Sequence, residues 1–377
     1  MKIVKIETHK YWIEWCNWLF VKVITDDGLH GWGEASLHGP IESVERAIHE
    51  IGASLIGEDP SGVERHWQRM YHGWRWRGGA TLMTALGGLD IALWDLEAKR
   101  LDVPLYRLLG GPFRDRLRVY ASHWLSDIAR PEDAFDGARE VVQRGFRGFK
   151  WGPFRADKLR EDEAAAIRDA AELMRAAREG AGDDVEIYVE CAELLSPRTA
   201  VLAAKAFEPY RPAWFEEPIP FENAAAMARL QSEIAVPIAT GERLLSRWEF
   251  RELIQNGGCK VIQPDIMHAA GITEVRKIAT MADTEYLPVA PHNPGGPICN
   301  LAAMHLAASI PNFLVLEQME GERALRDELC TEPVRYEDGH FHLPTGPGLG
   351  TDLNLEVLKG RDFRPQKARG SSESLWR

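Results

Sequence analysis

One repeating pattern fills the sequence from Leu117 onward, and it limits the fold more than any other feature. Short apolar runs with strand character alternate with segments of helical periodicity. Eight apolar runs have this character: 118–124, 146–151, 186–191, 213–218, 236–242, 260–265, 285–292 and 313–318. The segments between them, such as 131–144, 161–180, 196–207 and 271–283, are rich in good helix formers. Because strands that alternate with helices pair in parallel, eight such units predict a closed (β/α) barrel.

The later strands share a second feature, a polar side chain at the carboxyl end. These side chains follow one another at intervals of 23 to 27 positions: Glu190, Glu216 (with Glu217 beside it), Glu242, Asp265, His292 and Glu317. One strand, one helix and two short loops occupy this much chain. The spacing therefore predicts that all of them lie at the carboxyl face of the barrel, where barrel enzymes carry their catalytic groups.

Three of these residues form a candidate metal site. Glu190, Glu216 and Glu242 follow three consecutive strands, so their carboxylates can converge above the barrel. Hard oxygen ligands of this kind suit Mg²⁺, whereas three buried carboxylates without a cation would repel one another. The alternative is that each acid caps a helix or forms half of an ion pair. All three acids follow their strands at the same point of the repeating unit, which favours the metal site over this alternative.

The next two strand ends supply a candidate acid–base pair, Asp265 and His292. A carboxylate bonded to one imidazole nitrogen fixes the tautomer and leaves the other nitrogen as a base. A proton alpha to a carboxylate is too weakly acidic for histidine unless a metal ion stabilises the product anion. Lys150 and Glu317 are candidates for contact with that anion, Glu317 only if it carries a proton. The alternative for both residues is that each is a charged residue at the barrel rim without a catalytic role.

The region before the barrel predicts a smaller α+β unit. Residues 3–9 and 19–28 alternate as strands do, with a turn signal at Asp27-Gly28. From position 41 to about 107 the apolar spacing is helical.

Charge and cysteine content limit the partners and the compartment. A formal net charge of -12 disfavours nucleic acid and anionic membranes, so a small-molecule partner is expected. The N-terminus lacks an uncharged apolar run of signal-peptide or membrane-span length. Five scattered cysteines do not suggest a disulfide framework, which fits the cytoplasm. Barrels of this type often form homo-oligomers, but no residue indicates one.

Several motifs carry a resemblance to a known family. They are ALGGLDIALWDLEAKRLDVPLYRLLGG at 85–111, FEEP at 215–218, TGER at 240–243, QPDI at 263–266, PHNPGGP at 291–297 and PGLGTDL at 347–353. In this order, over nearly the whole chain, they resemble the mandelate racemase subgroup of the enolase superfamily. The resemblance implies a modified TIM (β/α) barrel under an α+β capping domain formed from the N-terminal region and the C-terminal segment. We expect the cap over 1–112, the barrel over 113–317, and the returning segment over 318–377.

The same resemblance implies the metal ligands and the dyad named above, and the chain departs from the family at three positions. Glu190 stands where the family usually has Asp. Ala192 stands where members that resemble galactonate dehydratase carry a second His. The Lys-x-Lys of racemases and cycloisomerases is replaced by Lys150-Trp151-Gly152.

These departures favour elimination over inversion. Inversion of a stereocentre needs a donor and an acceptor on opposite faces, whereas dehydration can use one base that later helps the hydroxyl to leave. With His292 as the firm base, we expect a metal-dependent acid-sugar dehydratase that forms a 2-keto-3-deoxy sugar acid. The alternatives are a racemase or epimerase of a 2-hydroxy acid or related carboxylate, with Lys150 as second base, and a catalytically degenerate family member. His123 is an auxiliary acid or a packing residue.

Substrate choice is expected to come from the cap. Residues 11–18 and 73–79 are rich in aromatics, and Arg75 and Arg77 in the second segment can clamp a carboxylate. The alternative is that the tryptophans of 73–79 pack the cap against the barrel.

Overall fold

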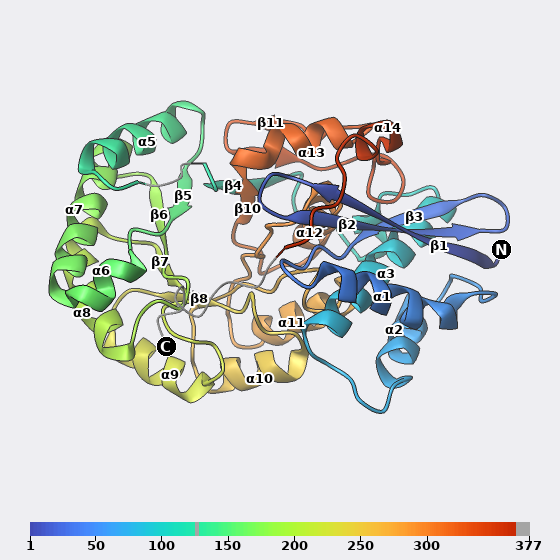
Figure 1. The fold of residues 1–377 in the computed structure, drawn as a ribbon, viewed down its shortest axis with the longest axis horizontal. Helices are drawn as coiled ribbons and strands as arrows, with labels where there is room; N and C mark the ends of the chain where they lie inside the picture. The colour runs from blue at the N-terminus through green and yellow to red at the C-terminus, as the bar shows by residue number, and fades with distance from the viewer. Residues whose placement is uncertain (125–127, 367–377) are drawn as a thin grey trace.

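The computed structural model describes residues 1–124 and 128–366, and it shows a cap beside a barrel (Figure 1). The cap begins with an antiparallel sheet in the order β1-β2-β3. Its strands are β1 (Ile3–Trp12), β2 (Asn17–Thr25) and β3 (His30–Glu34). The alternating pattern predicts the first two strands but does not indicate β3, which contains Gly31 and Gly33. A Cβ on Gly31 would lie 2.1 Å from a main-chain oxygen of the helix behind the sheet, so close packing requires these glycines.

Helices complete the cap. They are α1 (Ile41–Gly52), η1 (Ala53–Leu55), α2 (Val63–His72), α3 (Ala80–Arg100) and α4 (Leu105–Leu108). The long helix α3 is buried on nearly all sides, because it packs between the cap sheet and the barrel helix α11 (Ile272–Asp283). This helix therefore joins the cap to the barrel.

The barrel strands pair in parallel in the predicted order. They are β4 (Arg116–Ser122), β5 (Gly148–Trp151), β6 (Glu186–Glu190), β7 (Trp214–Glu216), β8 (Ile238–Thr240), β9 (Val261–Ile262) and β10 (Leu316–Met319). β10 pairs with β4 and so brings the last strand back to the first. The predicted barrel is confirmed.

The seventh unit differs from the prediction. Residues 285–292 form no regular strand; in their place, Val289 makes isolated parallel bridges to Ile262 and Phe313 that complete the ring. Prolines precede Val289 and follow Ala290, and each removes a main-chain donor that a ladder needs. This irregular stave carries His292 at its end.

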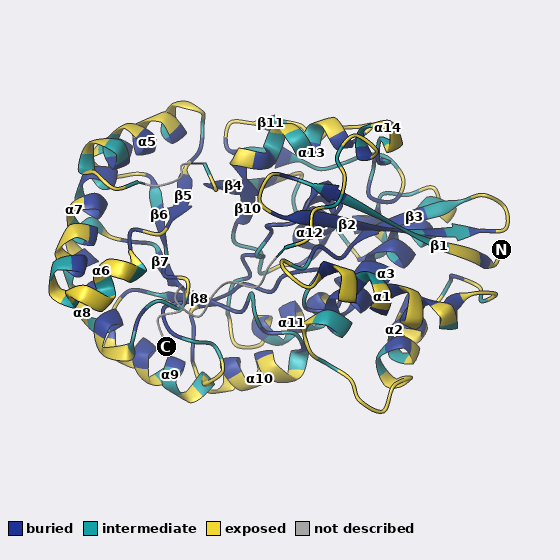
Figure 2. Cartoon of the chain, viewed as in Figure 1, coloured by how far each residue is buried: buried dark blue, intermediate teal, exposed yellow. Residues whose placement is uncertain are grey.

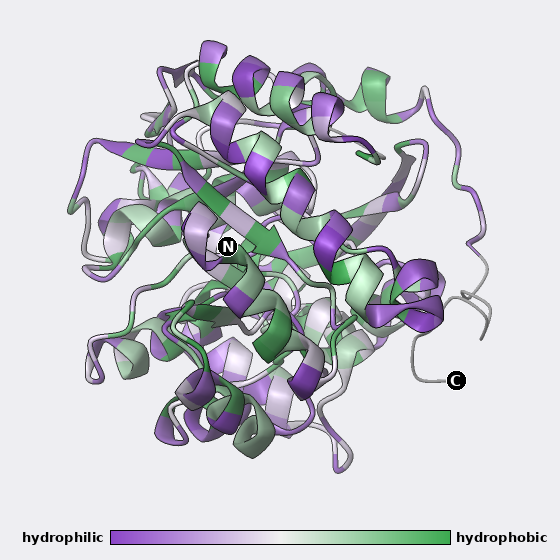
Figure 3. Cartoon of the chain, turned by 90° about the vertical axis from the view of Figure 1, so that its left-hand side faces the viewer, coloured by the Kyte–Doolittle hydropathy of each residue, from purple (hydrophilic) through white to green (hydrophobic). Residues whose placement is uncertain are grey.

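Helices surround the strands (Figure 1). Besides α11 they are α5 (Pro131–Gln143), α6 (Ala156–Glu161), α7 (Glu163–Ala181), α8 (Pro197–Phe207), η2 (Glu208–Tyr210), α9 (Ala224–Glu233), α10 (Arg247–Gln255) and α12 (Pro297–Ser309). Most bury one face and expose the other (Figure 2), and hydrophilic and hydrophobic bands alternate along them (Figure 3). α12 and α6 are exceptions, because every residue of α12 is buried and no residue of α6 is.

The C-terminal segment returns to the cap, as the family resemblance implies. It contains η3 (Glu320–Glu322), α13 (Arg323–Leu329), β11 (Tyr336–Glu337), β12 (His340–His342) and α14 (Leu355–Leu358). Beyond β12, the carboxylate of Asp352 accepts a hydrogen bond from Trp32 of the cap sheet at 2.8 Å. None of the helices in the described ranges has the length and apolar character of a membrane span.

Candidate active site

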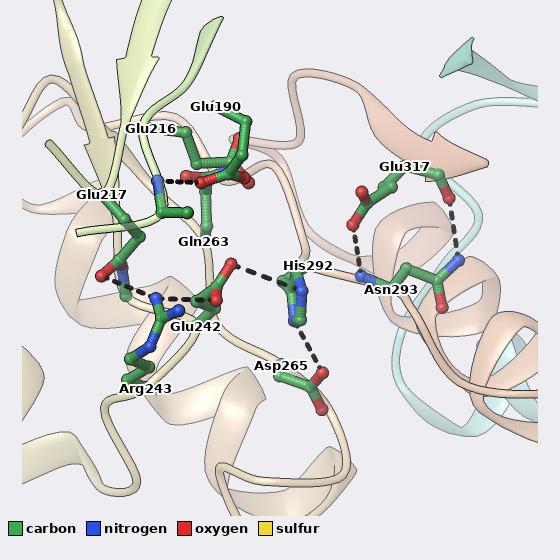
Figure 4. Close-up of polar contacts among 12 residues, drawn as sticks. Glu190, Glu216, Glu217, Glu242, Arg243, Gln263, Asp265, His292, Asn293 and Glu317 are labelled. Carbon is green, nitrogen blue, oxygen red and sulfur yellow. Dashed lines mark hydrogen bonds and ion pairs between the residues drawn. The ribbon is translucent and has the colours of Figure 1, made fainter. Parts of the chain in front are cut away.

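Three glutamates converge at the carboxyl ends of neighbouring strands. Glu190 ends β6, Glu216 ends β7 in register with it, and Glu242 follows β8. One carboxylate oxygen of each lies within 4.8 Å of the others, and the side chains gather on one side of His292 (Figure 4). The structure therefore brings together the three residues that the sequence predicts as metal ligands.

Burial makes this cluster unfavourable for bare carboxylates. It raises the pKa of Glu216 to about 8, and it also raises the pKa of Glu190. Glu242 differs, because His292 and Arg243 outweigh its burial and lower its pKa. A divalent cation would relieve the repulsion among the three carboxylates, and their oxygens are ligands that such a cation prefers.

Local hydrogen bonds fix Glu190 and Glu216. Oε1 of Glu190 accepts a hydrogen bond from the amide of Ala192 at 2.7 Å. Oε2 of Glu216 accepts from Gln263 Nε2 at 2.8 Å and from Trp214 Nε1 at 2.9 Å. The longer arm of Glu190 thus still reaches the cluster in a position where the family usually has Asp.

Lys150 of β5 lies beside these glutamates. Its Nζ contacts Glu216 and lies 2.9 Å from Glu317 and 3.4 Å from Glu190. Burial favours the neutral amine, but Glu216 and Glu317 outweigh it and hold the pKa of Lys150 well above its ordinary value. The side chain is therefore a fixed positive charge and is poorly suited to accept a proton.

Glu317 of β10 links Lys150 to the loop after His292. Its Oε2 accepts a hydrogen bond from the amide of Asn293 at 2.9 Å. Lys150 and His292 outweigh burial and lower the pKa of Glu317 well below its ordinary value. Because contact with an oxyanion would need a protonated Glu317, this geometry favours the ion-pair role.

His292 and Asp265 lie opposite the glutamates (Figure 4). His292 Nδ1 lies 2.9 Å from Asp265 Oδ2, and Asp265 Oδ1 accepts from the amides of Met267 and His268 at 2.8 and 3.0 Å. His292 Nε2 lies 3.4 Å from Glu242 Oε2. Burial lowers the pKa of His292, but Glu242 and Asp265 outweigh it and raise the pKa to about 10. Nε2 faces Glu242, so a cation held by that carboxylate would offset the largest cause of the raised pKa and free Nε2 to act as a base.

Glu190, Glu242, Glu317 and His292 line one cavity of about 1010 Å³, and Glu216 and Asp265 are fully buried beside them. Cap residues that line it are Trp15, Leu37, His38 and Ala80. Barrel residues Trp151, Phe154 and Phe221 add aromatic surface. The cavity is large enough for a sugar acid, and charged groups meet apolar ones in it.

Six polar lining residues were not indicated by the sequence, namely His38, Ser122, Arg155, Arg243, Glu249 and His268. Arg243 Nη1 lies 2.8 Å from Glu242. His268 comes three positions after Asp265 in the same loop, so its position in the sequence could have indicated that it lines the cavity. His38 follows β3, which the sequence pattern does not reveal.

His123 also lines the cavity at the end of β4. Its Nδ1 lies 3.9 Å from Glu322 Oε1, and its ring lies 5.6 Å from that of Trp15 in the cap. These contacts are compatible with both roles considered for it, auxiliary acid and packing residue.

The arginine-rich segment 73–79 does not line this cavity. The side chain of Arg77 lies over the ring of Tyr71 within the cap. Trp76 is 83% exposed. The expected carboxylate clamp from Arg75 and Arg77 is therefore not supported, and neither is packing of Trp76 against the barrel.

Two family models match the chain. The mandelate racemase / muconate lactonizing enzyme N-terminal domain matches residues 13–110, and the enolase C-terminal domain-like model matches residues 133–357. The chain belongs to the mandelate racemase / muconate lactonizing enzyme family. This membership confirms the resemblance that the sequence motifs carry.

Relatives of this family member match along nearly their whole length. The chain is 36% identical to D-galactonate dehydratase of Pectobacterium atrosepticum and 38% identical to that of Ralstonia pickettii, in each case over 95% of this chain and 94% of the relative. The mandelate racemase/muconate lactonizing enzyme of Jannaschia sp. CCS1 has a TM-score of 0.89 at 30% identity, covering 97% of this chain and 99% of that one. An enolase of Agrobacterium radiobacter with bound Na and L-malate has a TM-score of 0.90 at 31% identity, covering 98% and 97%.

Proposed function

We propose that this family member is a metal-dependent acid-sugar dehydratase, a hydro-lyase that turns an aldonate or aldarate into a 2-keto-3-deoxy sugar acid. The observation that carries the proposal is the Asp265–His292 dyad facing three clustered glutamates, with His292, Glu190 and Glu242 lining one cavity. Similarity over the whole chain to D-galactonate dehydratases supports the same reaction class.

We propose Mg²⁺ as the metal, held by Glu190, Glu216 and Glu242. The fit rests on three clustered oxygen ligands and on the raised pKa values of the buried Glu190 and Glu216, which a cation would lower. When bound, the ion stabilises negative charge on the substrate carboxylate.

His292 is proposed to take the alpha proton through Nε2. Asp265 accepts the hydrogen bond from Nδ1, which fixes the tautomer and the ring orientation. The electron pair of the C2–H bond passes into the carboxylate group and then returns to expel the hydroxyl group from C3. Lys150 offsets part of the negative charge of the glutamates throughout.

The leaving hydroxyl group needs a proton, and position 192 does not supply one because it is alanine. We propose that protonated His292 returns its proton to the departing hydroxyl group, so that water leaves from the face on which the proton was taken. The resulting enol becomes the 2-keto acid by proton transfer to C3.

A broad acid-sugar library incubated with Mg²⁺ tests the proposal, with 2-keto-3-deoxy acid as the measured product. Reactions in deuterated water separate the epimerase alternative, which returns labelled substrate without dehydrated product. Thermal unfolding with and without Mg²⁺ tests for a degenerate member, since a lost site gives no stabilisation. Glu216→Gln is expected to abolish that stabilisation, and the exposed Glu356→Gln is the matched control. Absence of keto acid across the library would count against the dehydratase.

The finer organisation is also proposed. We propose that the cap spans 1–112, the barrel 113–317 and the returning segment 318–377. The five cysteines are all buried and unpaired, which supports work in the reducing cytoplasm.

A further inference from the structure

The loop that carries the proposed base is held by two buried side chains of opposite charge. This catalytic loop, residues 292–296, joins the irregular seventh stave to α12, and everything after His292 in it is buried. Glu34 comes from cap strand β3 and is fully buried, and Arg326 comes from α13 and is 3% exposed. Neither belongs to the metal cluster or to the dyad.

Arg326 donates to main-chain oxygens of the catalytic loop. Its Nε donates to the carbonyl of Gly295 at 3.0 Å, and Nη2 donates to the carbonyl of Asn293 at 2.9 Å and also to that of Gly295. Burial lowers the pKa of Arg326, and Glu34 is among the charges that oppose this effect. The guanidinium makes no direct ion pair within 1–124 and 128–366, and the acids that oppose the effect of burial from farther away are Glu34, Glu322 and Glu317.

Glu34 meets the same loop from the other side. Its Oε1 accepts from the amide of Gly296 and from Ser36 Oγ, and its Oε2 accepts from the amide of Cys299 at 2.9 Å. These amides lie at the start of α12, a helix of 13 residues whose positive N-terminal end favours a carboxylate. Burial raises the pKa of Glu34, and the hydroxyl of Ser36 and the amides of Cys299 and Gly296 oppose that rise. The donors that favour the ionised carboxylate therefore include the segment that follows the base.

The two charges share one peptide group. The carbonyl of Gly295 accepts from Arg326, and the N–H of the same peptide bond, that of Gly296, donates to Glu34. The peptide dipole thus lies between a buried cation and a buried anion and connects them. Close approach requires glycine here, because a Cβ on Gly296 would lie 2.9 Å from the ring of Trp18.

We propose that Glu34 and Arg326 are positioning residues for His292 and act through the peptide 295–296. The proposal rests on the proposed function only in taking His292 as the base. Because one charge comes from the cap and the other from the C-terminal segment, the base reaches its working position only when both are docked on the barrel. Removal of either charge takes away the partner that the other meets through this peptide and frees one side of the loop.

Glu34→Gln tests the proposal, with Asp90→Asn as a matched control. Asp90 is also a fully buried cap carboxylate at the start of a barrel helix, where it accepts from the amide and the hydroxyl of Thr273 at 3.0 and 2.6 Å. That helix carries no catalytic residue. Both variants are expected to lower the Tm. Only Glu34→Gln should lower kcat, by about tenfold or more, with KM changed less than about threefold.

Amide hydrogen exchange of peptides covering 290–300 can be measured without substrate. It therefore tests the positioning of the loop even if the protein is not a dehydratase. Exchange there is expected to rise in Glu34→Gln and not in Asp90→Asn.

The double variant Glu34→Gln/Arg326→Gln should lose less stability than the sum of the single variants, because no unpaired charge remains buried. If Glu34→Gln does not fold, Arg326→Lys, which keeps the charge but loses the fork of donors, carries the same test. Equal exchange in Glu34→Gln and Asp90→Asn, or an unchanged kcat in folded Glu34→Gln, would overturn the proposal.

Discussion

Lys150 and His292 lie among four buried or half-buried glutamates at the site, and each charge in this set depends on the others. Lys150 contacts or closely approaches three of the glutamates, and His292 approaches Glu242. A single substitution at this site therefore changes the electrostatic environment of several neighbours. Its effect on metal binding and its effect on proton transfer must be measured separately.

His292→Asn isolates the proton transfer. We expect kcat to fall by about a thousandfold, which is within the range for loss of a general base. Stabilisation by Mg²⁺ should remain, because the three glutamates are unchanged. Initial rates of keto-acid formation and thermal unfolding with and without Mg²⁺ measure the two effects. A rate close to that of the unchanged protein would mean that another group takes the proton.

Lys150→Met tests how far the ammonium group of Lys150 offsets the negative charge of the clustered glutamates. Without the ammonium group, the clustered glutamates repel one another more strongly, so the metal-free protein is expected to unfold at a lower temperature. The rise in Tm on addition of Mg²⁺ should be larger than in the unchanged protein. Thermal unfolding in chelator and in Mg²⁺ measures both values. Lys277→Met, which removes a surface partner of Glu64, is the control and should leave the metal response as it was.

At the scale of helices and strands, the sequence predicts those parts of the fold that follow a regular period. The even spacing of the strand ends predicts the meeting of Glu190, Glu216 and Glu242, because each unit of a parallel barrel repeats the same geometry. It does not predict β3, whose glycines are selected by contact with α3. It also misassigns 285–292 as a strand, because the prolines there remove ladder donors.

The sequence also could not indicate the roles proposed for Glu34 and Arg326. They lie almost three hundred positions apart along the chain and meet through one peptide group, so no local pattern marks them. Lys150 was identified as a candidate, but its three carboxylate partners come from three other strands. Its charge state could be argued only once these strands were placed.

Gly87 of α3 illustrates how packing between elements overrides helix propensity. A Cβ at this position would lie 2.1 Å from the main-chain oxygen of Met267, in the loop that also holds Asp265. Gly87→Ala should gain up to about 1 kcal/mol of helix propensity but lose more through overpacking, typically about 1 to 3 kcal/mol. We expect a net loss of stability in denaturant unfolding together with a lower kcat. A more stable variant would show that the cap and barrel can separate here without cost.

At the scale of the whole molecule, α12 contacts the cap, the barrel strands and α13 of the C-terminal segment. His305 near the end of this helix is fully buried, and its ring stacks on that of Tyr106 from α4 at 5.5 Å. Its Nδ1 accepts a hydrogen bond from the amide of the same tyrosine at 3.1 Å. This contact needs a neutral imidazole, because a protonated Nδ1 cannot accept.

The global stability should therefore fall in mild acid through His305. Burial lowers the pKa of His305 to about 4. An unfolded histidine titrates near ~6.5, so below that pH the unfolded chain binds a proton that the folded protein excludes. Stability from this residue is complete above about pH 6.5 and is lost as the pH falls to about 4, by up to about 3 kcal/mol. Denaturant unfolding between these pH values should show a shallower dependence for His305→Asn, which keeps an acceptor near Nδ1, than for the unchanged protein. The exposed His49→Asn is the control, and equal slopes for His305→Asn and the unchanged protein would contradict the assignment.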